Sequence, residues 1–136
     1  MRIVIIHFLN TEKEINAEII KHLQSAATEN GHQVDVVNGN EDVSNFRIIP
    51  YEYVTILASS TGPFSKQITP RISEVLATCG NSSGKKGAAL ILKNLIFSQK
   101  ICYSLMRTME KEGLILDYSD IIESVEHADS VGKKLG

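Results

Sequence analysis

Short apolar runs typical of strands alternate with amphipathic helical patterns along this chain, and this alternation limits the folds that it can adopt. The first run, residues 2–7 (RIVIIH), is almost continuously β-branched, as in a strand that is covered on both faces. Further strands are expected at residues 33–37, 53–58 and 87–92, and from residue 114. The pattern predicts an α/β fold with a parallel sheet, helices on both faces and right-handed crossovers.

Four helices are expected between and after these strands. The first ends at Asn30-Gly31, where the glycine is typical of a helix C-terminus. Its expected inward residues are Ile15, Ile19, Ile20, Leu23, Ala26 and Ala27. Thr69-Pro70 has the pattern of an N-cap followed by a proline in the first helical turn. Ser98 is expected to cap the third helix, and the fourth lies near residues 125–135.

Length and composition predict a single domain, residues 1–136, with a largely aliphatic core. The sequence is 43% hydrophobic but only 6% aromatic, and its net charge is −2. That charge argues against nucleic-acid binding, and the apolar run at residues 3–9 is too short to span a membrane. We therefore expect a cytoplasmic protein with no nucleic-acid or membrane partner. Cys79 and Cys102 lack redox or metal spacing and are expected to be buried free thiols.

Three loops of the predicted fold are placed to bind a ligand. In such sheets ligands lie beyond the carboxyl ends of the strands, where the strand order reverses. The loops at that edge are residues 8–13, 59–66 and 93–97. The second is rich in hydroxyl groups. The third contains an apolar segment, residues 95–97, that would line a pocket, be buried within the protein or contact a second subunit, so we expect a monomer or a weak homodimer.

Several segments resemble the flavodoxin-like family, and the resemblance covers nearly the whole chain. TEKEINAEII is similar to the start of that family's first helix, and ILASSTGPF to its second flavin loop. GKKGAALIL, LMRTMEKEG and EHADSVGKKLG are similar to a later strand, a glycine-ended helix and the closing helix. The resemblance implies a three-layer α/β/α sandwich, a five-stranded parallel sheet of order 2-1-3-4-5, and noncovalently bound FMN. It also implies electron transfer, and hence a redox partner protein.

The resemblance also assigns candidate FMN-binding residues in all three loops. Hydroxyl and amide groups of the second loop would contact the flavin or its ribityl chain, and Phe64 would stack on the isoalloxazine ring. The alternative for this loop is a polar turn built by Gly62-Pro63. The candidates are Asn10, Thr11 and Lys13 in the first loop, Ser59, Ser60, Thr61, Gly62 and Phe64 in the second, and Asn94 and Phe97 in the third.

The first loop departs from the family's phosphate motif, S/T-x-T-G-x-T. Aligned through Ala17, the specified positions of the motif fall on Phe8, Asn10, Thr11 and Lys13, and none of them matches. Two interpretations stay open. The loop is either an ordinary helix start without a ligand, or a rearranged phosphate cradle that uses Asn10, Thr11 and Lys13.

The segment Thr11-Glu12-Lys13-Glu14 has the spacing of a capping box, in which Thr11 is the N-cap and bonds reciprocally with Glu14. Glu12 and Glu14 would repel a phosphate at this helix N-terminus. Two functions therefore remain. One is a divergent flavodoxin-like protein that binds FMN and transfers electrons. The other is a flavin-free binding or regulatory domain that keeps the fold.

No constellation of catalytic residues stands out in the sequence. The four histidines, at positions 7, 22, 32 and 127, have no metal-binding spacing, and no Ser-His-Asp or Cys-His arrangement is evident. His7 is expected to be a hydrogen-bonded residue at a strand end. We therefore expect no catalytic and no metal-binding residues, and an electron carrier or binding protein rather than an enzyme.

Overall fold

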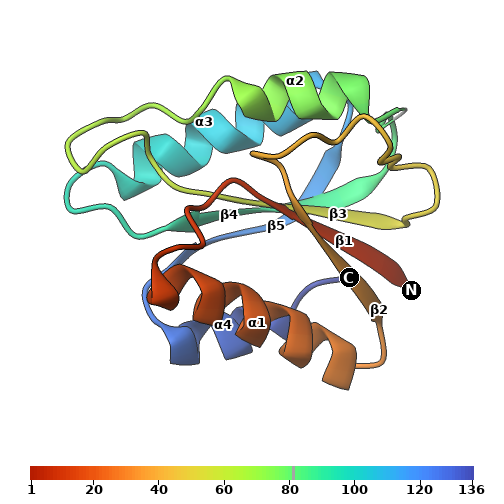
Figure 1. Ribbon diagram of the computed structural model, residues 1–136, viewed down its shortest axis with the longest axis horizontal. Helices are drawn as coiled ribbons and strands as arrows, with labels where there is room; N and C mark the ends of the chain where they lie inside the picture. The colour runs from red at the N-terminus through yellow and green to blue at the C-terminus, as the bar shows by residue number, and fades with distance from the viewer. Residues whose placement is uncertain (81) are drawn as a thin grey trace.

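The computed structural model describes residues 1–80 and 82–136, which form a five-stranded parallel sheet between two pairs of helices (Figure 1). The strands are β1 Arg2–His7, β2 Gln33–Asn38, β3 Tyr53–Ala58, β4 Lys86–Leu92 and β5 Ile115–Ile122. The helices are α1 Glu14–Glu29, α2 Arg71–Thr78, α3 Ser98–Lys111 and α4 Val125–Gly132. Neighbouring strands follow the order β2-β1-β3-β4-β5, which confirms the predicted topology. Figure 1 shows α2 and α3 on one face of the sheet and α1 and α4 on the other.

Strands β1 and β3 lie inside the sheet, where a strand must contribute apolar side chains to the cores on both faces. Val4 and Ile6 point to the core beneath α2 and α3, whereas Ile3 and Ile5 point to the core beneath α1 and α4. All four side chains are fully buried. Because successive side chains of a strand face opposite sides, only a run without polar positions can fill both cores. Burying each isoleucine stabilises the fold by roughly 2 kcal/mol.

Most of the residues predicted to face inward from helix α1 are buried, but the first of them, Ile15, is not. Ile19, Ile20 and Leu23 are buried, whereas Ile15 is 56% exposed. The inward position of the first turn belongs to Asn16, three residues before Ile19, and its side chain donates to the Asn10 carbonyl at 3.0 Å. A helix turns by about 100° per residue, so Ile15 points to solvent when Asn16 points inward.

The predicted side-chain caps of α2 and α3 are also wrong. Helix α2 begins at Arg71 with Pro70 as N-cap, and Thr69 Oγ1 only accepts a 3.3 Å bond from the Arg71 amide. Helix α3 begins at Ser98 itself, with Phe97 as N-cap. In both cases the helix starts one residue away from the position that the hydroxyl would need. Such one-residue differences are common where no strong cap fixes the start.

The two cysteines lie in the core of the protein. Cys79 and Cys102 are buried and not in a disulfide, as predicted, and burial raises the pKa of both thiols. None of the helices within residues 1–80 and 82–136 has the length and apolar character needed to cross a bilayer.

Thr55, at the middle of β3, carries a buried hydroxyl group whose removal should change the stability of the protein. Its side chain is fully buried, and its Oγ1 has no hydrogen-bond partner among the described residues. Replacing it with valine removes an unsatisfied hydroxyl and keeps the β-branched shape. We expect Thr55→Val to raise the free energy of unfolding by about 1 kcal/mol, measured by urea denaturation. A clear loss of stability would mean that the hydroxyl is hydrogen-bonded, for example to a buried water.

Candidate functional site

A groove lies where β3 and β4 end and α1 begins, at the edge of the sheet where the sequence predicted a ligand. Its volume is about 490 Å³. The residues that line it are Lys13, Asn16, Ser59, Ser60, Thr61, Gly62, Pro63, Leu92, Lys93, Asn94 and Leu95. They come from three segments that are distant in the sequence. The parallel sheet brings them together because all its strands end at the same edge.

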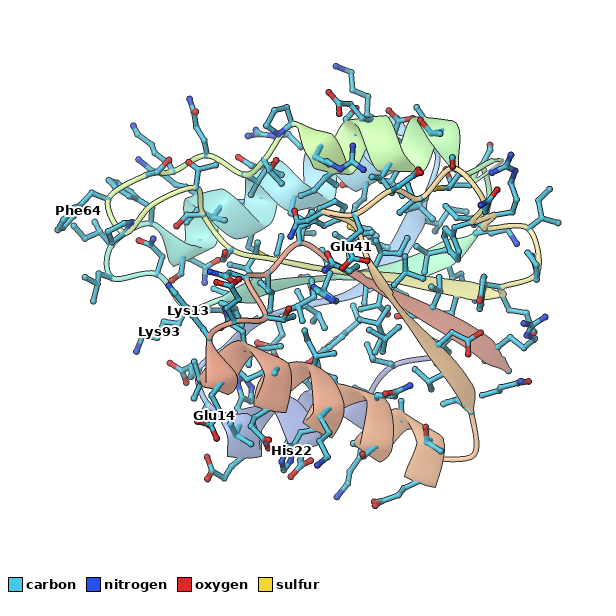
Figure 2. All side chains as sticks on the ribbon, in the orientation of Figure 1. Lys13, Glu14, His22, Glu41, Phe64 and Lys93 are labelled. Atoms are coloured by element: carbon cyan, nitrogen blue, oxygen red, sulfur yellow. The ribbon has the colours of Figure 1, made fainter. Side chains whose placement is uncertain are left out.

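The structure brings together six of the ten candidate residues. Those that line the groove are Lys13, Ser59, Ser60, Thr61, Gly62 and Asn94. Asn10, Thr11 and Phe97 do not line it, and neither does Phe64, whose side chain is 71% exposed. Figure 2 shows Phe64 at the outer end of the β3–α2 loop, far from Lys13 and Lys93. Stacking of Phe64 on a flavin ring therefore stays a prediction.

Sequence reasoning missed several groove residues. Lys93 and Leu95 lie inside the third loop, but only Asn94 and Phe97 were selected from it. Asn16 was missed because the helix start was placed too early. A signal for Asn16 was present, because it lies three and four residues before Ile19 and Ile20 and so interrupts the apolar stripe with a polar side chain.

Asn94 joins the two loops on either side of the groove. Its side chain is 9% exposed, and its Nδ2 donates to Ser60 Oγ at 2.8 Å. Its Oδ1 accepts from the amides of Ile96 and Phe97 at 3.0 and 3.1 Å. Ser98 Oγ accepts from the Asn94 amide and donates to the Asn94 carbonyl, at 2.8 and 2.9 Å. Asn94 therefore fixes the β4–α3 loop and ties it to the β3–α2 loop.

The β3–α2 loop is also ordered by its own hydroxyl groups. Ser60 Oγ donates to the Gly62 carbonyl at 2.7 Å, so its proton is already used. Thr61 Oγ1 and Ser65 Oγ lie 2.9 Å apart, and the Thr61 amide donates to the Gln67 carbonyl at 2.9 Å. These bonds give the loop a defined shape before any ligand is present. Pre-ordering of this kind reduces the entropy that a bound molecule has to remove.

The β1–α1 loop is closed by its own side chains, and the predicted capping box is wrong. The N-cap of α1 is Lys13, and no side chain caps the helix. Asn10 forms an Asx turn instead, since its Oδ1 accepts from the Glu12 amide at 3.0 Å. The Asn10 carbonyl accepts from the Lys13 amide at 3.3 Å and from Asn16 Nδ2. The amides of Glu12 and Lys13 therefore already have acceptors within the loop.

The two charged side chains that line the groove are both lysines. Lys13 and Lys93 line it, and Figure 2 shows both side chains at this edge of the sheet. Lys93 Nζ lies 3.3 Å from Glu123 Oε1, and both side chains are about 60% exposed. An exposed pair of this kind is weak, so Lys93 can exchange Glu123 for an anionic ligand. The described residues contain no cluster of three or more metal-binding side chains.

His7, at the end of β1, is a buried, hydrogen-bonded histidine, as predicted. It is 4% exposed, and its Nδ1 accepts from the Leu9 amide at 3.4 Å. Burial lowers the pKa of its imidazole, and the negative charge of Glu41 opposes that shift only in part. His7 is therefore neutral at pH 7 and stabilises the loop rather than supplying a proton.

The lowered pKa of His7 predicts a pH dependence of stability. The unfolded chain takes up a proton at this residue near its ordinary pKa, whereas the folded protein does so only at lower pH. The free energy of unfolding should therefore fall as the pH decreases from about 7 to about 5. His7→Gln should flatten that decline, measured by urea denaturation at several pH values. Equal slopes for the two proteins would show that His7 does not carry the effect.

Solved structures with the same architecture include several flavodoxins. The chain superimposes on oxidised flavodoxin 2 from Bacillus cereus with a TM-score of 0.73 and 12% identity, covering 97% of this chain and 95% of the other. For two-electron reduced flavodoxin from Megasphaera elsdenii the TM-score is 0.72 and the identity 11%, covering 96% of both chains. For oxidised flavodoxin 1 from Bacillus cereus they are 0.69 and 14%, over the full length of both. No model of a protein family matches this sequence, and no curated protein matches it. The chain therefore has a flavodoxin-like fold.

Proposed function

We propose that this protein binds FMN noncovalently in the groove at the ends of β3 and β4, and acts as an electron carrier. The observation that supports this most is the convergence of Lys13, the hydroxyl-rich loop and Asn94 at the edge where a flavodoxin-like sheet reverses its strand order. The groove combines cations, hydroxyl groups and pre-ordered backbone, which are the groups that a phosphorylated, polar ring system requires.

The residues of the groove divide into two roles toward FMN. The β3–α2 loop, residues 59–62, would contact the polar edge of the isoalloxazine ring and the ribityl hydroxyls. Lys13 and Lys93 would neutralise the phosphate, because the amides of Glu12 and Lys13 are bonded to Asn10 within the β1–α1 loop. Asn94 would hold both loops in position. Bound FMN supplies the redox chemistry, and the chain supplies binding and electrostatics.

This arrangement predicts that the phosphate is recognised by charge rather than by a backbone cradle. FMN and riboflavin differ only in that phosphate, so comparing them isolates it. The double variant Lys13→Gln and Lys93→Gln should weaken FMN binding about tenfold at low salt, since each exposed charge contact contributes roughly 0.5–1 kcal/mol. Riboflavin binding should change less than about twofold. Titrations that follow the quenching of flavin fluorescence measure both affinities.

The matched control removes two lysines outside the groove, Lys21 in the middle of α1 and Lys133 just after α4. Lys21→Gln with Lys133→Gln lowers the net charge equally but leaves the groove unchanged. This control should bind both flavins as the unmodified protein does. Equal weakening of FMN by the control and the groove variant would show that only the overall charge matters. Equal weakening of FMN and riboflavin would show that the lysines do not contact the phosphate.

The second candidate function is a flavin-free binding or regulatory domain. The closed β1–α1 loop favours it, and so does the groove itself, because none of the residues that line it is aromatic. Such a domain would leave the fluorescence of both flavins unquenched. A monomeric or weakly dimeric state and a cytoplasmic location stay predictions in either case, and a redox partner protein stays a prediction of the electron-carrier function.

A further inference from the structure

The charges of this chain are strongly segregated, although its net charge is only −2. Residues 59–113 contain eight of the 14 lysines and arginines but only three of the 16 acidic residues, which gives this segment a charge of +5 and the rest of the chain −7. The segment includes the β3–α2 loop, α2, β4 and α3. Within this segment α2 and α3 cover the same face of the sheet, whereas β4 lies in the sheet itself, so part of the positive charge is carried on the α2–α3 side of the molecule (Figure 1).

The basic residues gather where the β3–α2 loop meets the start of α3. Lys66 Nζ and Lys100 Nζ lie 5.7 and 5.8 Å from the centre of the Phe97 ring. Lys66 and Lys100 also line a shallow groove of about 330 Å³ together with Tyr103, Ser104 and Arg107. Positions 100, 103, 104 and 107 repeat at helical spacing, so the groove follows one face of α3.

The cations of this groove have no acidic partner among the residues that the structure describes. The ion pairs found among the described residues do not include Lys66, Lys100 or Arg107. Other basic residues, such as Arg71 and Lys93, do have an acidic partner within 4.0 Å. Three cations that share a groove without a counter-charge repel one another, and a bound anionic surface would relieve that repulsion.

Large apolar side chains are exposed on the two loops that lead to these cations and in the groove itself. Phe64, Leu95 and Ile96 are 71%, 79% and 63% exposed, and Tyr103, within the groove itself, is 58% exposed. These four are half of the large hydrophobic residues that the described chain exposes. Asn94 holds the two loops that carry Phe64, Leu95 and Ile96 against each other. The apolar side chains are therefore presented on ordered loops, as in a preformed interface.

We propose that this basic-apolar surface, made by Phe64, Leu95 and Ile96 with Lys66, Lys100 and Arg107, docks an acidic partner protein. An apolar centre with a charged rim is the usual composition of a protein interface. The rim charge is complementary to carboxylates, which steer the partner and speed association. A nucleic acid fits less well, because the charge of −7 on the rest of the molecule would repel an extended polyanion. The proposal does not depend on FMN.

The test uses a short fluorescent peptide in which aspartates and glutamates surround two leucines, and a second peptide in which lysines replace the acidic residues. Fluorescence anisotropy measures the binding of each. The acidic peptide should bind at least about tenfold more tightly than the basic one, and high salt should weaken it. In NMR titrations the amide signals of Leu95, Ile96 and Lys100 should shift.

Two surface variants and one control localise the binding. Lys66→Glu with Lys100→Glu should weaken binding of the acidic peptide about tenfold or more, and Leu95→Ser with Ile96→Ser about fivefold. The control, Lys21→Glu with Lys133→Glu, changes the net charge as much as the first variant but lies on α1 and α4. It should alter binding less than about twofold.

Several outcomes would overturn the proposal. These are an equal effect of the control and the Lys66/Lys100 variant, no preference for the acidic peptide, or tighter binding of a single-stranded oligonucleotide of similar length. A dimer seen by analytical ultracentrifugation and abolished by the Leu95/Ile96 variant would assign the surface to a second copy of this chain instead. Because the assays run without FMN, failure of flavin binding would not affect their result.

Discussion

The Gly87→Ala variant is expected to lose about 3 kcal/mol of unfolding free energy or more. A Cβ at Gly87 would lie 2.2 Å from the Val54 carbonyl oxygen. Gly87 pairs with Val54 between β4 and β3, and a register shift between Gly87 and Ala88 disturbs the pairing with β5. The clash is with backbone, so it is relieved only by separating two central strands. Urea denaturation measures the loss.

Gly62→Ala is the matched control for this prediction. No atom lies within 4 Å of a Cβ at Gly62, and its φ is not positive. The same chemical change there should alter stability by less than about 0.5 kcal/mol. A Gly87→Ala protein as stable as the Gly62→Ala protein would mean that β3 and β4 are farther apart than the structure has them.

The second large effect is expected for Asn94→Ala, which disconnects the two loops of the candidate site. The variant loses the bonds to Ser60 Oγ and to the amides of Ile96 and Phe97. Removing a largely buried side chain with several partners should cost about 2 kcal/mol of stability. FMN affinity should fall about tenfold or more, because the groove loses its pre-ordered walls. Urea denaturation and flavin quenching measure the two effects.

The Asn30→Ala variant is the control, because it removes a hydrogen-bonded asparagine outside the candidate site. Asn30 Nδ2 donates to the Lys133 carbonyl at 3.0 Å, at the end of α1 that is remote from the groove. This variant should keep full FMN affinity whatever it does to stability. If Asn94→Ala bound FMN as tightly as the Asn30→Ala protein, Asn94 would have no positioning role.

The layers and strand order followed from the sequence because their signals are local and redundant. Residues 2–7 and 53–58 were expected as strands, and β1 and β3 occupy those residues. Strand β5 was recognised only at its start. Its side chains alternate between more and less exposed positions and include Asp117 and Asp120, so it lacks a continuous apolar run. An edge strand needs burial on only part of its surface, and its pattern is correspondingly weaker.

The candidate site was harder to predict because its contacts join distant residues. The Thr11 capping box was an acceptable local pattern, but Asn10 organises the loop instead, because its side chain and carbonyl accept from the amides of Glu12 and Lys13. The role of Asn94 depends on Ser60, 34 residues earlier, and no local pattern reveals that bond. The charge segregation was present in the sequence, but its importance required the fold, which brings Lys66 of the β3–α2 loop beside Lys100 and Arg107 of α3.

The measurement that tests the proposed function most directly is a visible absorption spectrum of the purified protein after incubation with FMN and removal of free flavin. The proposal predicts a retained flavin spectrum and saturable quenching of FMN fluorescence when the protein is titrated. A colourless protein that leaves FMN fluorescence unquenched even at high concentration would contradict it. The groove would then belong to a flavin-free binding domain with a flavodoxin-like fold.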